Sequence, residues 1–349
     1  MFYGAAGAFK VATGLSGSVA CGNGYFGNPL NGVTKHCSYT VTGGVPGGLA
    51  AGATGALGPF VPHHFDVALS QGCGNFTYSG QPFSVTVTAR NAANATTRNY
   101  DGGSATAPNQ AKAVTLAAQS NAGVGSFNGT GMIGAGSFAS GVALVSTPAF
   151  TYTHKLTESL SVTVGANNAD GVSSTGHAQG ILGLRSGRLK VSNVFGPGAV
   201  SLLRLPVQAQ YWTGRAWALN DLDHCSSVPA SAMALSSYRD GKGAATSAWS
   251  TAASALTIAG GHGGVTFTAP SAGGTGSVDV ALNLGLATAD QSCLANHPVT
   301  VGGAAPWLRS QYGSTAACAA AHDRDPSARV TFGVYSPESR KNMYARESF

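Results

Sequence analysis

The stretch FTYSGQPFSVTVTARN, residues 76–91, decides the fold class of this chain of 349 residues. Between positions 83 and 89 its apolar and polar side chains alternate without interruption. The apolar set is Phe83, Val85, Val87 and Ala89, and the polar set is Ser84, Thr86 and Thr88. Successive side chains of a β-strand point to opposite faces, so this pattern predicts a strand with one buried and one solvated face.

A similar stretch, FTYTHKLTESLSVTVGAN, returns at residues 150–167. Both stretches open with Phe-Thr-Tyr, and both then reach Ser-Val-Thr-Val, at Ser84 and at Ser161. Alternating Val/Thr strands also resemble one another by chance. The shared opening and the Asn-containing tail favour a structural repeat, and we expect two related sheet segments, with two immunoglobulin-like modules in tandem as one arrangement.

The composition points to the same class. Only 9% of the residues are charged, against about 25% in an ordinary soluble domain, and 50 residues are glycine. Long helices held by ion pairs between successive turns lack the charges they need. We therefore expect an all-β chain of tandem β-sandwich modules, with antiparallel sheets and Gly-rich loops.

Changes in residue composition and in the alternation of apolar and polar residues along the chain suggest three parts. We expect a Gly-rich, loop-rich arm over residues 1–60 with one strand near 37–43, a β-sandwich with the internal repeat over 61–185, and a C-terminal β-sandwich over 186–349. Residues 111–119 fit a strand or a helix. In the last part, three strands are expected over 187–220 with a hairpin turn at Gly214, and a terminal hairpin across residues 336–341.

The cysteines are even in number and contain no C-x-x-C pair, which predicts disulfides formed in an oxidising compartment. The interval between Cys21 and Cys37 suits a local bond, while the other pairings stay open, and free buried thiols are the alternative. The six are Cys21, Cys37, Cys73, Cys225, Cys293 and Cys318.

Several partner classes are disfavoured. The net charge of +6 is spread thinly, without the basic stripe of a nucleic-acid-binding protein. No apolar run of about 18 residues exists to cross a membrane. The first residues make a poor signal peptide, so an exported protein would need a leader upstream of Met1 or in its place.

The sequence contains few patterns typical of a nucleotide-binding, catalytic or metal site. Neither of the two Gly-x-Gly-x-x-Gly matches, at 22–27 and 129–134, opens a convincing helix after a buried parallel strand, so we expect no nucleotide site. No local pattern marks catalytic residues, and no cofactor is expected. The loops 221–225 and 322–326 concentrate acids that suit either a cation or turn hydrogen bonds and ion pairs. The weak metal candidates are Asp221, Asp223, Asp323 and Asp325.

Two tryptophans flank the expected hairpin turn. If exposed, Trp212 and Trp217 would form a stacking platform for a sugar. If buried, they are core residues at strand ends. Both interpretations follow from the same spacing.

Several stretches, in order, resemble one bacterial family: the C-terminal region, of unknown function, of MSHA-type (mannose-sensitive haemagglutinin) pilus biogenesis protein Q and related large surface proteins. The resemblance implies an exported protein associated with a type IV pilus and transfers no catalytic residue. The stretches that carry it are VPHHFDV (61–67), CGNFTYSGQPFSVTVTARNAANATTRNYDG (73–102), GRLKVSNVFGPG (187–198), LRLPVQAQYWTGRAWALNDLDHCSS (203–227) and DPSARVTFGVYSPESRKNMYARESF (325–349).

These observations favour a non-enzymatic structural or adhesive module at the bacterial cell surface, acting in pilus assembly, at the pilus tip or in attachment. Its partners would be pilus or surface subunits, with a host or surface glycan as a further candidate. The rival hypotheses are a secreted carbohydrate-binding or carbohydrate-active protein and a self-assembling filament subunit.

Overall fold

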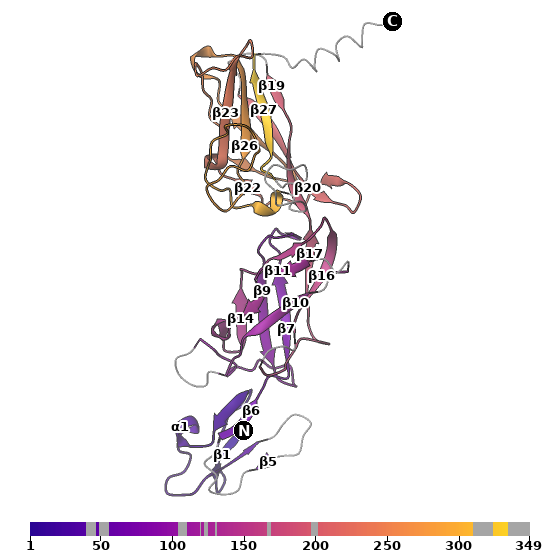
Figure 1. Ribbon diagram of the computed structural model, residues 1–349. Helices are drawn as coiled ribbons and strands as arrows, with labels where there is room; N and C mark the ends of the chain where they lie inside the picture. Colours follow the sequence, from indigo (N-terminus) through magenta and orange to yellow (C-terminus); the bar gives the residue numbers. More distant parts are fainter. Residues whose placement is uncertain are drawn as a thin grey trace. The chain divides into compact units, whose positions relative to one another are not determined.

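A computed structural model describes residues 1–39, 47–48, 56–103, 110–118, 120–121, 125–129, 131–165, 169–196, 202–309 and 324–333. Short strands joined by turns dominate it (Figure 1). Within these ranges, helical segments are confined to α1 (Asn23–Phe26) and four 3-10 turns, η1 (Ala135–Ser137), η2 (Ala230–Ala232), η3 (Ser271–Gly273) and η4 (Pro306–Leu308). The all-β prediction is confirmed.

The chain divides into two compact units that alternate along the sequence. Unit 1 comprises Met1–Ser70, Pro82–Ala149 and Ser159–Leu182, and unit 2 comprises Gln71–Gln81, Phe150–Glu158 and Gly183–Phe349. Both Phe-Thr-Tyr tripeptides therefore belong to unit 2, and both Ser-Val-Thr-Val stretches belong to unit 1.

The repeat supplies one strand to each of two sheets in unit 1. Strand β9 (Ser84–Arg90) pairs with β7 (His64–Ser70) on one side and with β14 (Val142–Val145) on the other. The apolar side chains of β9 are buried, and its polar side chains are half-buried. Strand β16 (Thr157–Val164), whose last positions also alternate between buried and half-buried, pairs with β10 (Val114–Ala118) instead. The two copies are thus related strands of one unit and do not build successive modules.

Short strands complete these sheets. β13 (Phe138–Ala139) pairs with β14, and β12 (Met132–Ile133) pairs with β10. Between β10 and β12 in the sequence lies the short strand β11 (Gly125–Phe127). Three aromatic rings fill the core beside β7, with Phe65 5.6 Å from Tyr100 and Tyr100 5.0 Å from Phe138 between ring centroids. Within residues 111–119 the structure forms the strand β10 at Val114–Ala118, so the helical alternative is wrong.

The first 60 residues contain more strands than the expected loop-rich arm. A four-stranded sheet has the order β2-β1-β4-β5, and β3 pairs with β6. The turn between β1 and β2 uses Ala6 and Gly7, both at positive φ, as a two-residue hairpin requires. Glycine at so many positions hides the alternation. The strands are β1 (Phe2–Ala5), β2 (Ala8–Val11), β3 (Gly17–Ala20), β4 (His36–Tyr39), β5 (Gly47–Gly48) and β6 (Ala56–Phe60).

Unit 2 contains two sheets around one core. In the first, β20 (Leu203–Trp212) pairs with β18 (Gly187–Val191), β21 (Trp217–Leu219) and β25 (His262–Phe267). The second has the order β19-β27-β26-β23. Its strands are β19 (Val194–Gly196), β23 (Met233–Asp240), β26 (Gly276–Leu282) and β27 (Ser327–Phe332), while β22 (Ser227–Val228) pairs with β24 (Leu256–Thr257).

Side chains of both sheets form a single hydrophobic cluster, which is the packing of a β-sandwich. The three strands expected over 187–220 are present as β18, β20 and β21, and Gly214 makes the hairpin turn at φ +94°. The expected terminal hairpin begins with β27, and its second half lies outside the described residues.

Two segments distant in sequence complete unit 2. They contain β8 (Thr77–Tyr78) and β15 (Phe150–Tyr152), and β8 pairs in parallel with the end of β17 (Gly180–Arg185), where Arg185 lies opposite Tyr78. The backbone N–H of Gly80 donates to the carbonyl of Phe150 at 2.8 Å. The two Phe-Thr-Tyr tripeptides therefore share one region of unit 2.

Candidate functional site

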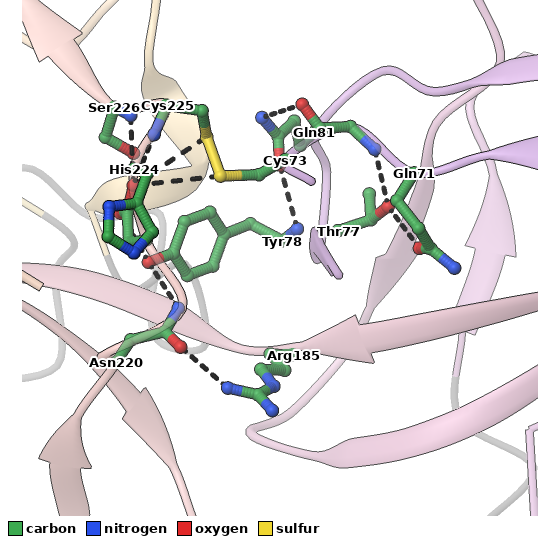
Figure 2. The surroundings of a disulfide bond; sticks show 12 residues. Gln71, Cys73, Thr77, Tyr78, Gln81, Arg185, Asn220, His224, Cys225 and Ser226 are labelled. Atoms are coloured by element: carbon green, nitrogen blue, oxygen red, sulfur yellow. Dashed lines mark hydrogen bonds between the residues drawn. A yellow bond between two sulfur atoms is a disulfide. The ribbon is translucent and has the colours of Figure 1, made fainter. Parts of the chain in front are cut away.

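A disulfide between Cys73 and Cys225 forms the centre of the candidate site, which lies wholly within unit 2 (Figure 2). The two cysteines are 152 positions apart, and their Cα atoms are separated by 5.6 Å. Cys73 is fully buried and belongs to the hydrophobic cluster of unit 2. The bond attaches the short segment 71–81 to the loop that follows β21.

The local sequence shapes this segment before any long-range contact is made. Gly74, at φ +59°, allows a tight turn in which the backbones of Cys73 and Phe76 exchange two hydrogen bonds, of 2.8 and 3.1 Å. The side chain of Gln81 accepts from the backbone N–H of Tyr78 at 3.0 Å and donates to the carbonyl of Gly72 at 3.2 Å. The segment thus presents Cys73 and Tyr78 in a braced conformation.

Tyr78 carries the polar centre of the site. Its hydroxyl donates to a carboxylate oxygen of Asp223 at 2.8 Å and accepts from the side-chain amide of Asn220 at 2.7 Å. All three side chains are inaccessible to solvent. Burial, together with the neighbouring carboxylate, raises the pKa of Tyr78 far above its ordinary value. The tyrosine therefore remains a neutral hydrogen-bond donor throughout the physiological range.

Both oxygens of the Asp223 carboxylate are occupied. Oδ2 accepts from Tyr78, and Oδ1 accepts from the backbone N–H groups of Cys225 and Ser226 at 3.1 and 3.0 Å. A buried carboxylate requires such partners, because its desolvation is otherwise very costly. These contacts make Asp223 a structural hydrogen-bond acceptor in this cluster.

The sulfurs and Asp223 also resemble a metal-binding group in their spacing. Both sulfur atoms lie 3.7 Å from Oδ1 of Asp223. A disulfide sulfur carries no proton, so these contacts are not hydrogen bonds. It is also no thiolate, which is the form that binds metals. In its oxidised state the cluster is a covalent anchor.

A cation closes the cluster on one side. Arg185 donates to the side-chain carbonyl of Asn220 at 2.6 Å, and its guanidinium carbon lies 4.5 Å from the ring centroid of Tyr211 and 5.3 Å from that of Phe76. The guanidinium is thus stacked on aromatic faces while it orients Asn220 toward Tyr78. Figure 2 shows Arg185 and Asn220 on the side of Tyr78 opposite Gln81.

The other acidic candidates are not brought together with Asp223. Asp221 is exposed on the turn before it. Asp325 is buried elsewhere in unit 2, where it pairs with Arg309 at 2.6 Å and accepts from the backbone N–H of Leu284 at 2.9 Å. Asp323 lies outside the described residues. Asp325 therefore serves an ion pair and hydrogen bonds, and Asp223 serves hydrogen bonds.

The tryptophan pair is half-buried and covered by cations. Trp212 and Trp217 lie opposite each other at the end of the β20–β21 hairpin, with ring centroids 5.6 Å apart. The ammonium of Lys155 lies 4.3 Å from the ring centroid of Trp212. The guanidinium of Arg188 lies 4.4 Å from that of Trp217. These cations occupy ring faces on which a sugar would stack.

The remaining cysteines follow the disulfide prediction where they are described. Cys21 is bonded to Cys37, at a Cα–Cα distance of 6.0 Å, in the small core of the N-terminal strands. Cys293 is also disulfide-bonded. Cys318 lies outside the described residues.

Sequence patterns did not single out Tyr78, Asn220 or Arg185. Tyr78 was visible only as part of the repeated tripeptide, and Asn220 only as the residue before the acidic loop. A signal was nevertheless present, since Asn, Asp and Cys follow β21 within six positions, as NDLDHC. Their partners, Tyr78 and Cys73, lie in one segment more than 140 positions earlier.

Comparison with protein families covers both parts of the chain. Residues 24–179 match the family model described as DUF6701, third domain, and residues 185–348 match that described as DUF6701, fourth domain. No curated protein matches the chain. Among the described residues, none of the helices has the length and apolar character needed to span a membrane.

Proposed function

The chain carries the third and fourth domains of the DUF6701 family, and on that premise we propose that it is a non-enzymatic structural or adhesive module of a bacterial cell surface. We further propose that it is associated with a type IV pilus of the MSHA type, in assembly, at the tip or in attachment. The observation that carries the proposal is the Cys73–Cys225 disulfide, whose Cys73 end is buried beside the hydrogen-bonded side chains of Tyr78, Asn220 and Asp223.

The disulfides support export to an oxidising compartment. Disulfides persist in the periplasm and at cell surfaces and are rare in the reducing cytosol. Cys73 is buried in the hydrophobic cluster of unit 2, and the neighbouring carboxylate of Asp223 is held by hydrogen bonds from Tyr78, Cys225 and Ser226, as expected for a bond formed once and then kept.

The covalent path suits a protein that carries tension. A force applied across the chain passes from Cys73 to Cys225 through the disulfide. Residues 74–224, which include β9, β10, β14 and β16 of unit 1, lie outside this covalent path, whereas β1 to β7 precede Cys73 and lie on it. A surface module under shear would thus transmit the force past β9, β10, β14 and β16 through the disulfide.

The sparse charge also fits an exposed module. With 9% charged residues, the protein depends little on ion pairs between surface groups. Such pairs weaken as salt screens them. A fold stabilised by apolar burial and disulfides keeps its stability across changing ionic strength.

Carbohydrate binding is the principal rival, and the tryptophan pair tests it. Lys155 and Arg188 would have to leave the rings of Trp212 and Trp217 before a sugar could stack there. A glycan array that binds the wild-type protein but not the Trp212→Ala variant would support adhesion through a glycan. An array without binding leaves attachment through protein subunits.

The decisive experiment follows the protein in its source bacterium. Thiol labelling before and after reduction measures the redox state, surface biotinylation measures exposure, and sheared pili are tested for co-purification. We expect an oxidised, surface-accessible protein in the pilus fraction, and a deletion strain with fewer pili or weaker attachment. A reduced cytoplasmic protein, or a deletion strain with unchanged pili and attachment, would overturn the proposal.

A further inference from the structure

Three histidines of unit 1 come together although they belong to two distant segments. His63 and His64 stand at the start of β7, and His177 lies in the loop that precedes β17. One ring nitrogen from each lies within 4.8 Å of the other two. We propose that His63, His64 and His177 form a binding site for a borderline divalent metal ion, of the Zn²⁺ or Cu²⁺ class.

The backbone builds this cluster in two steps. Neighbouring residues of an extended strand point to opposite faces, but the chain bends at His63 before β7 begins at His64. The N–H of His63 donates to the carbonyl of Arg90 at 2.7 Å, which holds the bend against β9. As a result, the Nδ1 atoms of His63 and His64 are 3.0 Å apart.

The third histidine, His177, lies in a loop that is hydrogen-bonded to β7. The N–H of Phe65 donates to the carbonyl of Ser173 at 3.0 Å, and the N–H of Val67 donates to that of Ala178 at 2.9 Å. These two bonds flank His177 and hold its backbone beside His64. The rings of His64 and His177 are stacked, with centroids 3.6 Å apart and an angle of 12° between planes.

The donor set selects the class of ion. Imidazole nitrogen suits Zn²⁺ and Cu²⁺, whereas Ca²⁺ and Mg²⁺ prefer oxygen. Two nitrogens at about 2.0–2.1 Å from a tetrahedral Zn²⁺ are themselves about 3.3 Å apart. The 3.0 Å between His63 and His64 is close to this spacing. Binding all three requires the His177 ring to turn out of its stack, and its exposure permits this.

The carboxylate of Asp66 lies near the second ring nitrogen of His64, the buried member of the proposed site. Nε2 of His64 lies 3.7 Å from Oδ1 of Asp66, and Oδ2 of Asp66 accepts from Arg90 at 2.7 Å. Histidine ligands are usually oriented by a carboxylate at the ring nitrogen that does not bind the metal. This arrangement favours the proton on Nε2 and leaves the lone pair of Nδ1 directed toward His63.

The three histidines line a cavity of about 830 Å³ together with Asn91 and Thr175, which leaves room for water or an external ligand on the ion.

Isothermal titration of untagged protein with Zn²⁺ and with Cu²⁺ tests the site. We expect one ion per chain, and at least a 10-fold loss of affinity in His177→Ala and in His63→Ala. His154→Ala is the matched control, because His154 is an exposed histidine outside the cluster, and it should bind as the wild type does. Asp66→Asn should weaken binding by about 10–100-fold without removing a ligand.

The controls separate loss of the site from loss of the fold. His177 is exposed, so His177→Ala should keep the circular dichroism spectrum and the metal-free melting temperature of the wild type. Added metal should raise the melting temperature of the wild type and of His154→Ala only. The proposal is overturned if wild-type protein binds neither ion, or if His63→Ala and His177→Ala, while folded, bind as tightly as the control.

Discussion

The hydroxyl of Tyr78 donates to the carboxylate of Asp223 at 2.8 Å, across 145 positions of sequence. This bond joins the repeated tripeptide motif to the acidic loop, and the Cys73–Cys225 disulfide lies directly beside it. Tyr78, Asn220 and Asp223 are buried, so water cannot replace a hydrogen-bond partner that one of them loses. The stability of unit 2 should therefore respond strongly to changes here.

Removing the Tyr78 hydroxyl should destabilise the protein by about 1–3 kcal/mol, because Tyr78→Phe leaves a buried carboxylate oxygen unsatisfied. The matched control is Tyr152→Phe, the same position of the second tripeptide. The hydroxyl of Tyr152 bonds to Glu158, which is half-buried and can turn to water, so the cost should be smaller. Urea denaturation followed by tryptophan fluorescence measures both.

Tryptophan fluorescence suits this comparison because all four tryptophans, Trp212, Trp217, Trp249 and Trp307, belong to unit 2. Equal free energies of unfolding for Tyr78→Phe and Tyr152→Phe would contradict the importance given to the Asp223 contact.

Stretching single molecules should reveal the covalent path. With the Cys73–Cys225 bond intact, the 152 positions between the cysteines cannot extend. Reduction, or a Cys73→Ala/Cys225→Ala variant, should add about 50 nm of extension at roughly 0.33–0.36 nm per residue. Optical tweezers with handles at the two ends measure this difference. An unchanged total extension would mean that the bond does not form in the folded protein.

Gly187 should not tolerate a side chain. A Cβ at this position would lie 2.2 Å from the ring of Tyr78, which is fully buried and cannot retreat. Overpacking of this kind costs about 1–3 kcal/mol. In Gly183→Ala, the new Cβ would meet its nearest atom at an ordinary 3.4 Å. Thermal melting should therefore show a clear loss for Gly187→Ala only, and similar losses would argue against the rigid packing of Tyr78.

Acidification should weaken unit 2 through His297. Its Nδ1 lies 2.5 Å from the hydroxyl of Ser236, and its Nε2 is buried with no partner in the described part of the chain. Burial lowers the pKa of His297 below 6.5, while Asp290, Asp279 and Asp325 oppose this change. The unfolded chain therefore takes up a proton first as the pH falls, and stability decreases below about pH 6.5.

Comparing how steeply the free energy of unfolding falls with pH in the wild type and in variants separates the contribution of His297 from that of the carboxylates. The loss of stability between pH 7.5 and 5.5 should be smaller in His297→Gln than in the wild type, whatever the absolute stability of the variant. His262→Gln, at an exposed histidine, should keep the wild-type slope. Parallel slopes in all three proteins would refute the assignment.

Much of the fold was predictable because it is written in local patterns. The alternation at 83–89 and its copy at 160–164 predicted strands, and these are β9 and β16. The hairpin at Gly214 followed from one glycine between two strand-like runs. Period-two alternation works because each residue's face depends only on the strand that contains it.

The N-terminal strands and the meaning of the repeat were less accessible. Strands of four residues rich in glycine carry too few side chains to show a period, so residues 1–60 were expected to be mostly loop. The repeat was visible, but whether its copies build two modules or two sheets of one unit depends on strand pairing. Pairing partners are set by the whole chain, and β9 and β16 find different ones.

By itself, the sequence determined that this protein is made of short, half-buried strands, since their alternation depends on residue type and spacing, and it favoured disulfides over free thiols. Only the tertiary structure decided which distant residues meet: Tyr78 with Asp223, Cys73 with Cys225, and His63 and His64 with His177. These contacts arise when sheets pack and loops are carried along with them, and no local periodicity records that geometry.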